Sequence, residues 1–567
     1  MDHEQRVERR RVRWFFAGLL VVSAVLDIVG ALLVQHQTRS QVLEALLPAS
    51  VTLGGRTGTV LSGLALLLLA GGIARGKRIA FRLTLLVLGA TIAFELVKDL
   101  DFEAASLFAW ILFGLWWFRH HFEADSDPSR MRWGIIVLAI GLVSATVYAI
   151  AGAALLENQL QPEFGVVRTV ESLMAALAGS PTAYRALTER ANWFLSTLPV
   201  VSYALIIFAL TQLLRPMLAP HPAAADRERV HQLLNVWGRN YISHLAVHGA
   251  SSYHWLDGDG CVAFTLRGRT ALALGDPIGP PGAVERAART FVAYCDHQDW
   301  IPAFYQVDDV APYRALGLSL VPIGAEALLR PASFRLRGKE RADLRYALNR
   351  CEKAGVHFVF GLGPEIVTEH AEQLQGVSGR WLQSHHSPEL GYSLGTLATL
   401  DDPDIVVGLA LAADGRLEAF VSWLPVPLRR GWTLDLMRRR PDSAYGVIEA
   451  LIVKSIEEAR GRGITELSLG MTPRVIASPT PRGLEGAWRA MYWGLDRFER
   501  SRTLQRFKAK FGPRWEDRYM VVPSTSTLPE VMVALVRAHL PPISATMAWI
   551  RSLVSREGAE AGRRAVA

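Results

Sequence analysis

The chain has 567 residues, of which 50% are hydrophobic, and it carries a formal net charge of +8. This length exceeds that of one ordinary domain, and the basic balance favours phosphates, anionic lipid or nucleic acid as partners without choosing among them. The three cysteines lie far apart in the sequence, which argues against a disulfide framework or a cysteine zinc site and fits a reducing compartment.

Long apolar runs separated by basic hinges fill the first 215 residues. A helix needs about 20 apolar residues to cross a bilayer, and six stretches approach that length: 14–34, 57–73, 79–97, 105–118, 133–156 and 193–213. Lys and Arg alternate between the connecting segments, twelve on one side against six on the other. By the positive-inside rule, the pattern predicts a multi-pass α-helical membrane domain over 1–215 with both the N-terminus and the rest of the chain in the cytoplasm.

Alternating helix and strand patterns follow a linker rich in proline and alanine at 214–225. They form two rounds, 226–330 and 331–525, which predict a cytosolic α/β region made of two lobes. Residues 526–567 are typical of amphipathic helices followed by a disordered tail.

One unit of the second lobe is more specific. The strand WTLDLMRR (432–439) leads through the turn RPDSAYG to the helix VIEALIVKSIEEARGRG and the strand ITELSLG. This order resembles the acyl-binding core of the GCN5-related N-acetyltransferase (GNAT) fold, in which a helix N-terminus cradles the pyrophosphate of coenzyme A. The Gln/Arg-x-x-Gly-x-Gly/Ala loop of that fold is missing here, so we expect a different activated acyl donor.

Two segments concentrate basic residues. Seven fall between Arg335 and Lys353, and eight between Arg497 and Arg518, where Phe and Trp are interleaved. Basic stripes of this kind fit a polyphosphate backbone, and aromatic residues among them fit stacking on unpaired bases. A solvated helix face and ordinary core aromatics explain the same pattern.

Asp435 and Arg438 stand at the C-terminal end of the strand at 432–439, where α/β folds commonly place ligands. A carboxylate and a guanidinium there suit a general base and an oxyanion or phosphate binder, although a structural salt bridge has the same spacing. His385 and His386 are consecutive and therefore diverge, and no matching acids lie nearby in the sequence. No metal site is predicted.

Eight segments, in the same order, resemble the catalytic domain of the phosphatidylglycerol lysyltransferases and alanyl-phosphatidylglycerol synthases, the multiple peptide resistance factor family. They are 240–255, GDPIGP (275–280), AFYQVDD (303–309), 333–355, WLQSHHSPELGYSLG (381–395), LDLMRRRPDSAYG (434–446), LSLGMTP (467–473) and LQRFKAKFGPRWEDRY (504–519). The resemblance implies tandem GNAT-like lobes at 226–330 and 331–525 that take an amino acid from aminoacyl-tRNA and esterify it to a membrane phospholipid.

The resemblance also implies roles for individual residues. It assigns catalysis to Asp435, Arg438 and Lys510, and substrate binding to Glu389, Tyr392 and Ser393. Contacts to tRNA are expected from the basic segments, at Lys339, Arg341, Arg345, Lys353, Arg506 and Lys508. Because an aminoacyl ester is already activated, neither a metal nor a cofactor beyond the aminoacyl-tRNA is expected.

The expected product is lysyl- or alanyl-phosphatidylglycerol at the cytoplasmic face of a bacterial inner membrane. Its added amine lowers the negative surface charge, which by the family likeness gives resistance to cationic antimicrobial peptides. Two alternatives stay open: aminoacyl transfer to another acceptor, such as diacylglycerol or a cell-wall precursor, and a lipid flippase or transporter with a cytosolic regulatory domain. The oligomeric state is also open.

Overall fold

The computed structural model describes residues 3–33, 49–99, 102–122, 128–177, 182–198, 223–248, 252–256, 260–385, 387–473 and 497–541, together with residues 200 and 204. The chain divides into two units, Met1–Leu218 with Asp296–Trp300, and Ala219–Cys295 with Ile301–Ala567. His386, most of the stretch 193–213 and the amphipathic segment expected after residue 541 lie outside the described residues.

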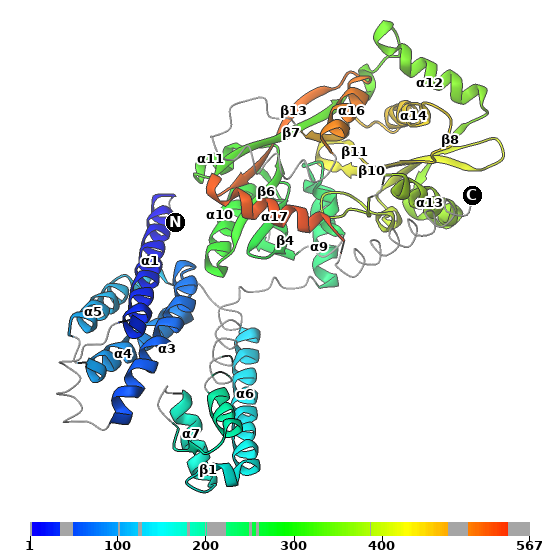
Figure 1. The fold of residues 1–567 in the computed structure, drawn as a ribbon. Coiled ribbons are helices and arrows are strands. Elements are labelled where there is room, and N and C mark those ends of the chain that lie inside the picture. Colours follow the sequence, from blue (N-terminus) through cyan, green and yellow to red (C-terminus); the bar gives the residue numbers. More distant parts are fainter. Residues whose placement is uncertain are drawn as a thin grey trace. The chain divides into compact units, whose positions relative to one another are not determined.

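The first unit is mostly helical (Figure 1), with one short two-stranded sheet of β1 (Leu160–Gln161) and β2 (Arg185–Ala186). Its longer helices are α1 (His3–Leu33), α3 (Ala49–Ala74), α4 (Arg78–Asp99), α5 (Phe102–Trp117), α6 (Pro128–Leu155) and α7 (Val166–Leu177). One apolar cluster joins α1, α3, α4 and α5 through the fully buried Leu20, Leu66, Leu88 and Leu115. Apolar residues of these helices therefore pack against one another.

The predicted multi-pass membrane domain is wrong on this structure. Among the described residues, no helix combines the length and the apolar character that crossing a bilayer requires. The 16 residues of α5 fall short of the roughly 20 that are needed. Charged residues begin α1 and lie at both ends of α4.

One mixed sheet of eleven strands organises the described part of the second unit, in the order β3-β4-β5-β6-β13-β7-β12-β11-β10-β9-β8. The strands are β3 (Ser252–Leu256), β4 (Gly260–Arg267), β5 (Thr270–Leu274), β6 (Ile301–Val307), β7 (Ser319–Leu329), β8 (His357–Leu362), β9 (Val406–Leu411), β10 (Leu417–Val426), β11 (Gly431–Arg439), β12 (Glu466–Pro473) and β13 (Arg514–Val522). Because β13 inserts between β6 and β7, the two halves of the unit share one sheet.

Helices cover both faces of this sheet (Figure 1). They are α9 (Ala224–Trp237), α10 (Pro281–Gln298), α11 (Ala311–Ala315), α12 (Ala342–Lys353), α13 (Gly363–Ser384), α14 (Val447–Gly461), α16 (Arg497–Ala509) and α17 (Leu528–His539). Alternation along β10 divides the core, because Val421 packs with the α12 and α14 side and Phe420 with the α9 and α13 side.

The strands β11 and β12 are joined through α14 and pair in parallel over three residues only. The pairs run from Gly431 opposite Glu466 to Thr433 opposite Ser468. Beyond Thr433 the pairing ends, and β12 shifts register against β7 between Ser468 and Met471. Asp435 thus lies on a stretch of β11 that does not pair with β12.

Candidate active site

Asp435 projects from β11 towards the segment 389–401. The backbone N–H of Gly395 donates to Asp435 Oδ1 at 2.7 Å, and Ser422 Oγ from β10 lies 3.4 Å from Oδ2. Asp435 as a whole residue is half-buried, and burial of its carboxyl raises the pKa to about 6. A carboxyl with this pKa is suited to accept and return a proton near neutral pH.

Arg438 lies three residues further along β11, and its side chain is buried. Its Nη2 donates to Glu389 Oε1 at 2.9 Å, its Nη1 donates to Ser378 Oγ, and its guanidinium lies 5.3 Å from the ring centroid of Trp381. Burial lowers the pKa of Arg438, while the charges of Glu389 and Asp435 act in the opposite direction. One strand therefore carries both a carboxyl with a pKa of about 6 and a buried, positively charged guanidinium.

Glu389 also organises the loop that follows it, because its Oε1 accepts the N–H of Leu397 at 3.0 Å. Tyr392 adopts a φ of 64° and donates its hydroxyl to the Ala273 carbonyl at 3.1 Å. Ser393 Oγ is 2.7 Å from His539 Nε2. The three residues expected to bind substrate thus hold one segment between β11, β5 and α17.

The two lysines near the end of α16 differ in environment. Lys510 Nζ donates to Glu449 Oε1 at 2.9 Å in the first turn of α14, and no contact with Asp435 is seen. Lys508 is buried, and its Nζ donates to the carbonyls of Gly470 and Met471 at 2.9 and 3.1 Å. Burial lowers the pKa of Lys508 to about 8.

Gly470 lies close to both the Lys508 ammonium and strand β11. A Cβ at Gly470 would lie 3.5 Å from Lys508 Nζ and 3.6 Å from the carbonyl oxygen of Leu434, the residue before Asp435. The Lys508 ammonium therefore occupies the region where β11 and β12 no longer pair, which does not suit the surface contact with tRNA expected for it. In the sequence, only the neighbouring Phe507 and Phe511 indicate that Lys508 is buried, and this signal is weak.

The other predicted tRNA contacts separate into two groups. Lys339, Lys353 and Arg506 are exposed. Arg341 donates to the Lys510 carbonyl at 2.7 Å, and Arg345 donates to the carbonyls of Leu336 and Gly338, each at 2.7 Å. In the second group, Arg345 supports the backbone at residues 336–338, and Arg341 connects this segment to Lys510.

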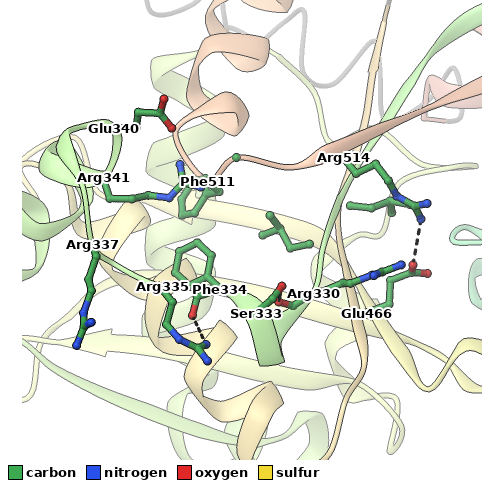
Figure 2. A pocket seen from close by; sticks show the side chains of 13 residues that line it. Arg330, Ser333, Phe334, Arg335, Arg337, Glu340, Arg341, Glu466, Phe511 and Arg514 are labelled. Atoms are coloured by element: carbon green, nitrogen blue, oxygen red, sulfur yellow. Dashed lines mark hydrogen bonds and ion pairs between the residues drawn. The ribbon is translucent and has the colours of Figure 1, made fainter.

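A cavity of about 440 Å³ lies beside that backbone, at the end of β7 and the α16–β13 turn. We call it the arginine pocket, because Arg330, Arg335, Arg337, Arg341 and Arg514 line it together with Glu340 and Glu466. Figure 2 shows Arg335, Arg337 and Arg341 on one side of it and Arg330 and Arg514 near Glu466 on the other. Arg514 belongs to the basic segment 497–518 that was expected to contact tRNA, whereas Arg330 lies outside both basic segments.

Histidines and aspartates form a cluster that the sequence did not indicate. The Nε2 atoms of His244 and His248 lie 3.1 and 2.9 Å from Asp402 Oδ2, and His231 Nε2 lies 2.6 Å from Asp404 Oδ2. Burial acts to raise the pKa of Asp402, but hydrogen bonds from His244 and His248 outweigh it and hold that pKa well below its usual range. His248 also lowers the pKa of Asp435 by its charge, so the cluster borders the site.

The ligand atoms of His244, His248 and Asp402 lie close enough together to be tested as a metal site. A histidine that binds a metal through Nε2 normally donates its other N–H to an acceptor. The Nδ1 of His244 is buried without a hydrogen-bond partner. The cluster therefore fits a hydrogen-bonded histidine–aspartate network better than a metal site.

Comparisons with known proteins find relatives of this chain. The chain is 27% identical over 507 residues to an uncharacterised protein of Corynebacterium glutamicum, covering 83% of this chain and 63% of that protein. It is 26% identical over 417 residues to the lysylphosphatidylglycerol biosynthesis bifunctional protein LysX of Mycobacterium tuberculosis, covering 71% of this chain and 35% of LysX. The chain thus spans less than two thirds of the length of these relatives.

A solved structure, L-PGS from Bacillus licheniformis, superposes with a TM-score of 0.51 at 26% identity over 56% of this chain and 97% of that one. The family described as phosphatidylglycerol lysyltransferase, C-terminal, matches residues 231–522. This match covers more than half of the chain and includes Asp435, Arg438 and the loop that holds them. The chain therefore belongs to the phosphatidylglycerol lysyltransferase C-terminal domain family.

Proposed function

We propose that this protein is an aminoacyltransferase that moves an amino acid from aminoacyl-tRNA to phosphatidylglycerol at the cytoplasmic surface of a bacterial membrane. The observation that carries the proposal is the pairing, on one strand of a family-matched domain, of a carboxyl with a pKa of about 6 and a buried arginine. The names of LysX and of the family supply the lipid and the lysyl group.

The reaction exchanges one ester for another. The free glycerol hydroxyl of the lipid attacks the aminoacyl carbonyl, a new carbon–oxygen bond forms, and the bond to the terminal ribose oxygen breaks. The hydroxyl proton passes to Asp435 and from there to the departing ribose oxygen, so the carboxylate is regenerated. Because the donor ester is already activated, the step balances without ATP, a metal or a redox partner.

Arg438 and the segment 389–395 position the reactants. The Arg438 guanidinium, held by Glu389 and Ser378, supplies positive charge beside Asp435 where negative charge develops on the carbonyl oxygen. Gly395 fixes the carboxylate from the opposite side. Most of the rate acceleration then comes from placing two bound substrates next to a fixed base.

Lys510 is proposed to act through the start of α14 rather than on the reacting atoms, because its ammonium pairs with Glu449. Lys508 lies nearer to β11 and is proposed to maintain the gap between β11 and β12.

The test is direct transfer. The full chain is incubated with phosphatidylglycerol vesicles and tRNA charged with labelled lysine or, separately, alanine, and lipid-soluble label is measured. We expect label in the lipid, no label after ribonuclease treatment, and no transfer by Asp435→Asn. Transfer that survives ribonuclease or the Asn substitution contradicts the proposal. The same assay identifies the amino acid, and diacylglycerol in place of phosphatidylglycerol tests the acceptor.

A further inference from the structure

We propose that the arginine pocket binds phosphodiester groups of an RNA strand. The inference rests on the proposed function, since it assigns the place where the RNA part of the donor is held. None of the residues carrying it belongs to the Asp435–Arg438 group.

Positive charge exceeds negative charge in the arginine pocket, although Arg514 also pairs with Glu516 at 2.6 Å. Five arginines line it against two glutamates, Glu340 and Glu466. Glu466 is already engaged, because its Oε1 accepts the Tyr241 hydroxyl at 2.5 Å and lies 3.5 Å from Arg429 Nη1, and its Oε2 lies 3.7 Å from Arg514. The pocket therefore presents an excess of positive charge to an incoming ligand.

Arg330 and Arg337 are the free donors of the arginine pocket. Both side chains are exposed, and neither makes a hydrogen bond or an ion pair with any residue the structure describes. Arg335 uses its Nη1 for the carbonyls of Ala332 and Phe334 and leaves its other nitrogens available. A planar guanidinium donates two parallel hydrogen bonds to a phosphate, so these side chains match a phosphodiester.

The wall that carries these arginines is fixed before any ligand arrives. Arg345 holds the carbonyls of Leu336 and Gly338, and Arg341 reaches across to the Lys510 carbonyl. Gly512 permits this crossing, because a Cβ there would lie 2.0 Å from Arg341 Nη2. A preformed wall lowers the entropy lost on binding.

The composition of the pocket favours RNA over a bilayer. Protein segments that bind membranes combine basic residues with exposed apolar side chains that enter the lipid. The exposed residues lining this pocket are mainly arginines, whereas Leu328, Leu329 and Phe511 are buried. Single-stranded nucleic acid binds in positively charged grooves through its phosphates.

The experiment measures the affinity of the full chain for an uncharged RNA minihelix with a single-stranded CCA end, by fluorescence anisotropy at several salt concentrations. The pocket variant is Arg330→Ala with Arg337→Ala. The control variant, Arg286→Ala with Arg314→Ala, removes two exposed arginines from other elements of the same unit, so both variants lose the same charge.

We expect the pocket variant to bind the RNA about tenfold more weakly and the control variant to bind like the unchanged protein. The slope of log affinity against log salt should fall by about 0.7 for each single-strand phosphate that the variant no longer binds. Arg330→Lys with Arg337→Lys should retain part of the affinity, because the charge is kept while the planar fork is removed. Unaltered thermal unfolding checks that the variants fold.

Two outcomes overturn the inference. In one, the pocket and control variants bind RNA equally well. In the other, the pocket variant keeps its RNA affinity but loses cosedimentation with phosphatidylglycerol vesicles, which makes the pocket a lipid headgroup site. Failure of the proposed function is distinguishable from both outcomes, because the unchanged protein would then transfer no amino acid. The RNA-binding measurements would still decide the role of the arginine pocket.

Discussion

Gly395 donates its backbone N–H to one oxygen of Asp435 and leaves no room for a side chain beside the other. The donor–acceptor distance is 2.7 Å, and a Cβ at Gly395 would lie 1.9 Å from Asp435 Oδ2. The glycine thus fixes the carboxylate by a hydrogen bond and by close approach at once.

Gly395→Ala should move the Asp435 carboxylate and lower kcat by about 100-fold, since displacements near 1 Å have effects of that size. Overpacking should also lower the free energy of unfolding by about 1–3 kcal/mol. Lipid transfer and urea unfolding measure the two effects. Gly461→Ala, at the exposed end of α14, is the control, because a Cβ there meets nothing within 4 Å. Equal activity of the two variants would remove the role given to Gly395.

Asp435→Asn should abolish transfer yet stabilise the protein. The pKa of Asp435 is raised to about 6, so between its unfolded value near 4 and pH 6 the folded state binds more protons and loses stability as pH rises. Asn lacks this penalty, which above pH 6 is on the order of 1–3 kcal/mol. Urea unfolding at pH 5 and 8 measures it, and a variant that is less stable at pH 8 points to a structural aspartate.

The pH profile of the unchanged protein gives a separate check on Asp435. If its carboxylate is the base, kcat/KM should decline below about pH 6, by about tenfold for each pH unit once the carboxyl is mostly protonated. The transfer assay over pH 4.5–8, with unfolding followed in parallel, provides the measurement. A flat profile across pH 6 in folded protein excludes that role.

Local sequence patterns predicted the strand and the helix around this site. They did not predict contacts between residues far apart in the sequence. The strand carrying Asp435 and the helix from Val447 are observed as β11 and α14, because apolar periodicity fixes both. The insertion of β13 between β6 and β7 depends on pairing across some 200 residues, which periodicity does not encode. The His244–Asp402 contact likewise joins positions 158 apart. In the first unit the long apolar runs misled, because among the described residues no helix combines the length and the apolar character of a membrane span.

Lys508→Met should remove a pH-dependent part of the stability. Burial lowers the pKa of Lys508 to about 8, so between pH 8 and its unfolded value near 10.5 the unfolded state binds more protons and the protein gains stability as pH rises. From pH 8 to 10 the free energy of unfolding of the unchanged protein should therefore rise relative to that of the variant. Lys510→Met, at a more exposed lysine, should show no such widening; the opposite order of the two variants refutes the assignment.

Glu389→Ala should weaken the protein and the reaction together, because it leaves the buried Arg438 without its ion pair. Breaking a buried pair is strongly destabilising, and since Glu389 is partly exposed we expect a loss of about 2 kcal/mol. Glu389→Gln keeps an acceptor oxygen and should recover most of the stability but less of kcat. Urea unfolding and steady-state kinetics separate the two. Glu369→Gln, on an exposed side chain of α13, serves as the control.

The His244–His248–Asp402 cluster should bind no stoichiometric zinc. Its Asp402 already lies within 3.1 Å of both imidazoles and accepts the Asp404 backbone N–H, and the buried His244 Nδ1 lacks the acceptor that a metal-bound histidine needs. Metal analysis of the purified protein should find sub-stoichiometric zinc, and treatment with a chelator should change neither the melting temperature nor lipid transfer. His244→Asn should lower the melting temperature with or without zinc, because it weakens the hydrogen bonding of Asp402. One equivalent of zinc that disappears in the Asn variant would instead establish a metal site beside Asp435.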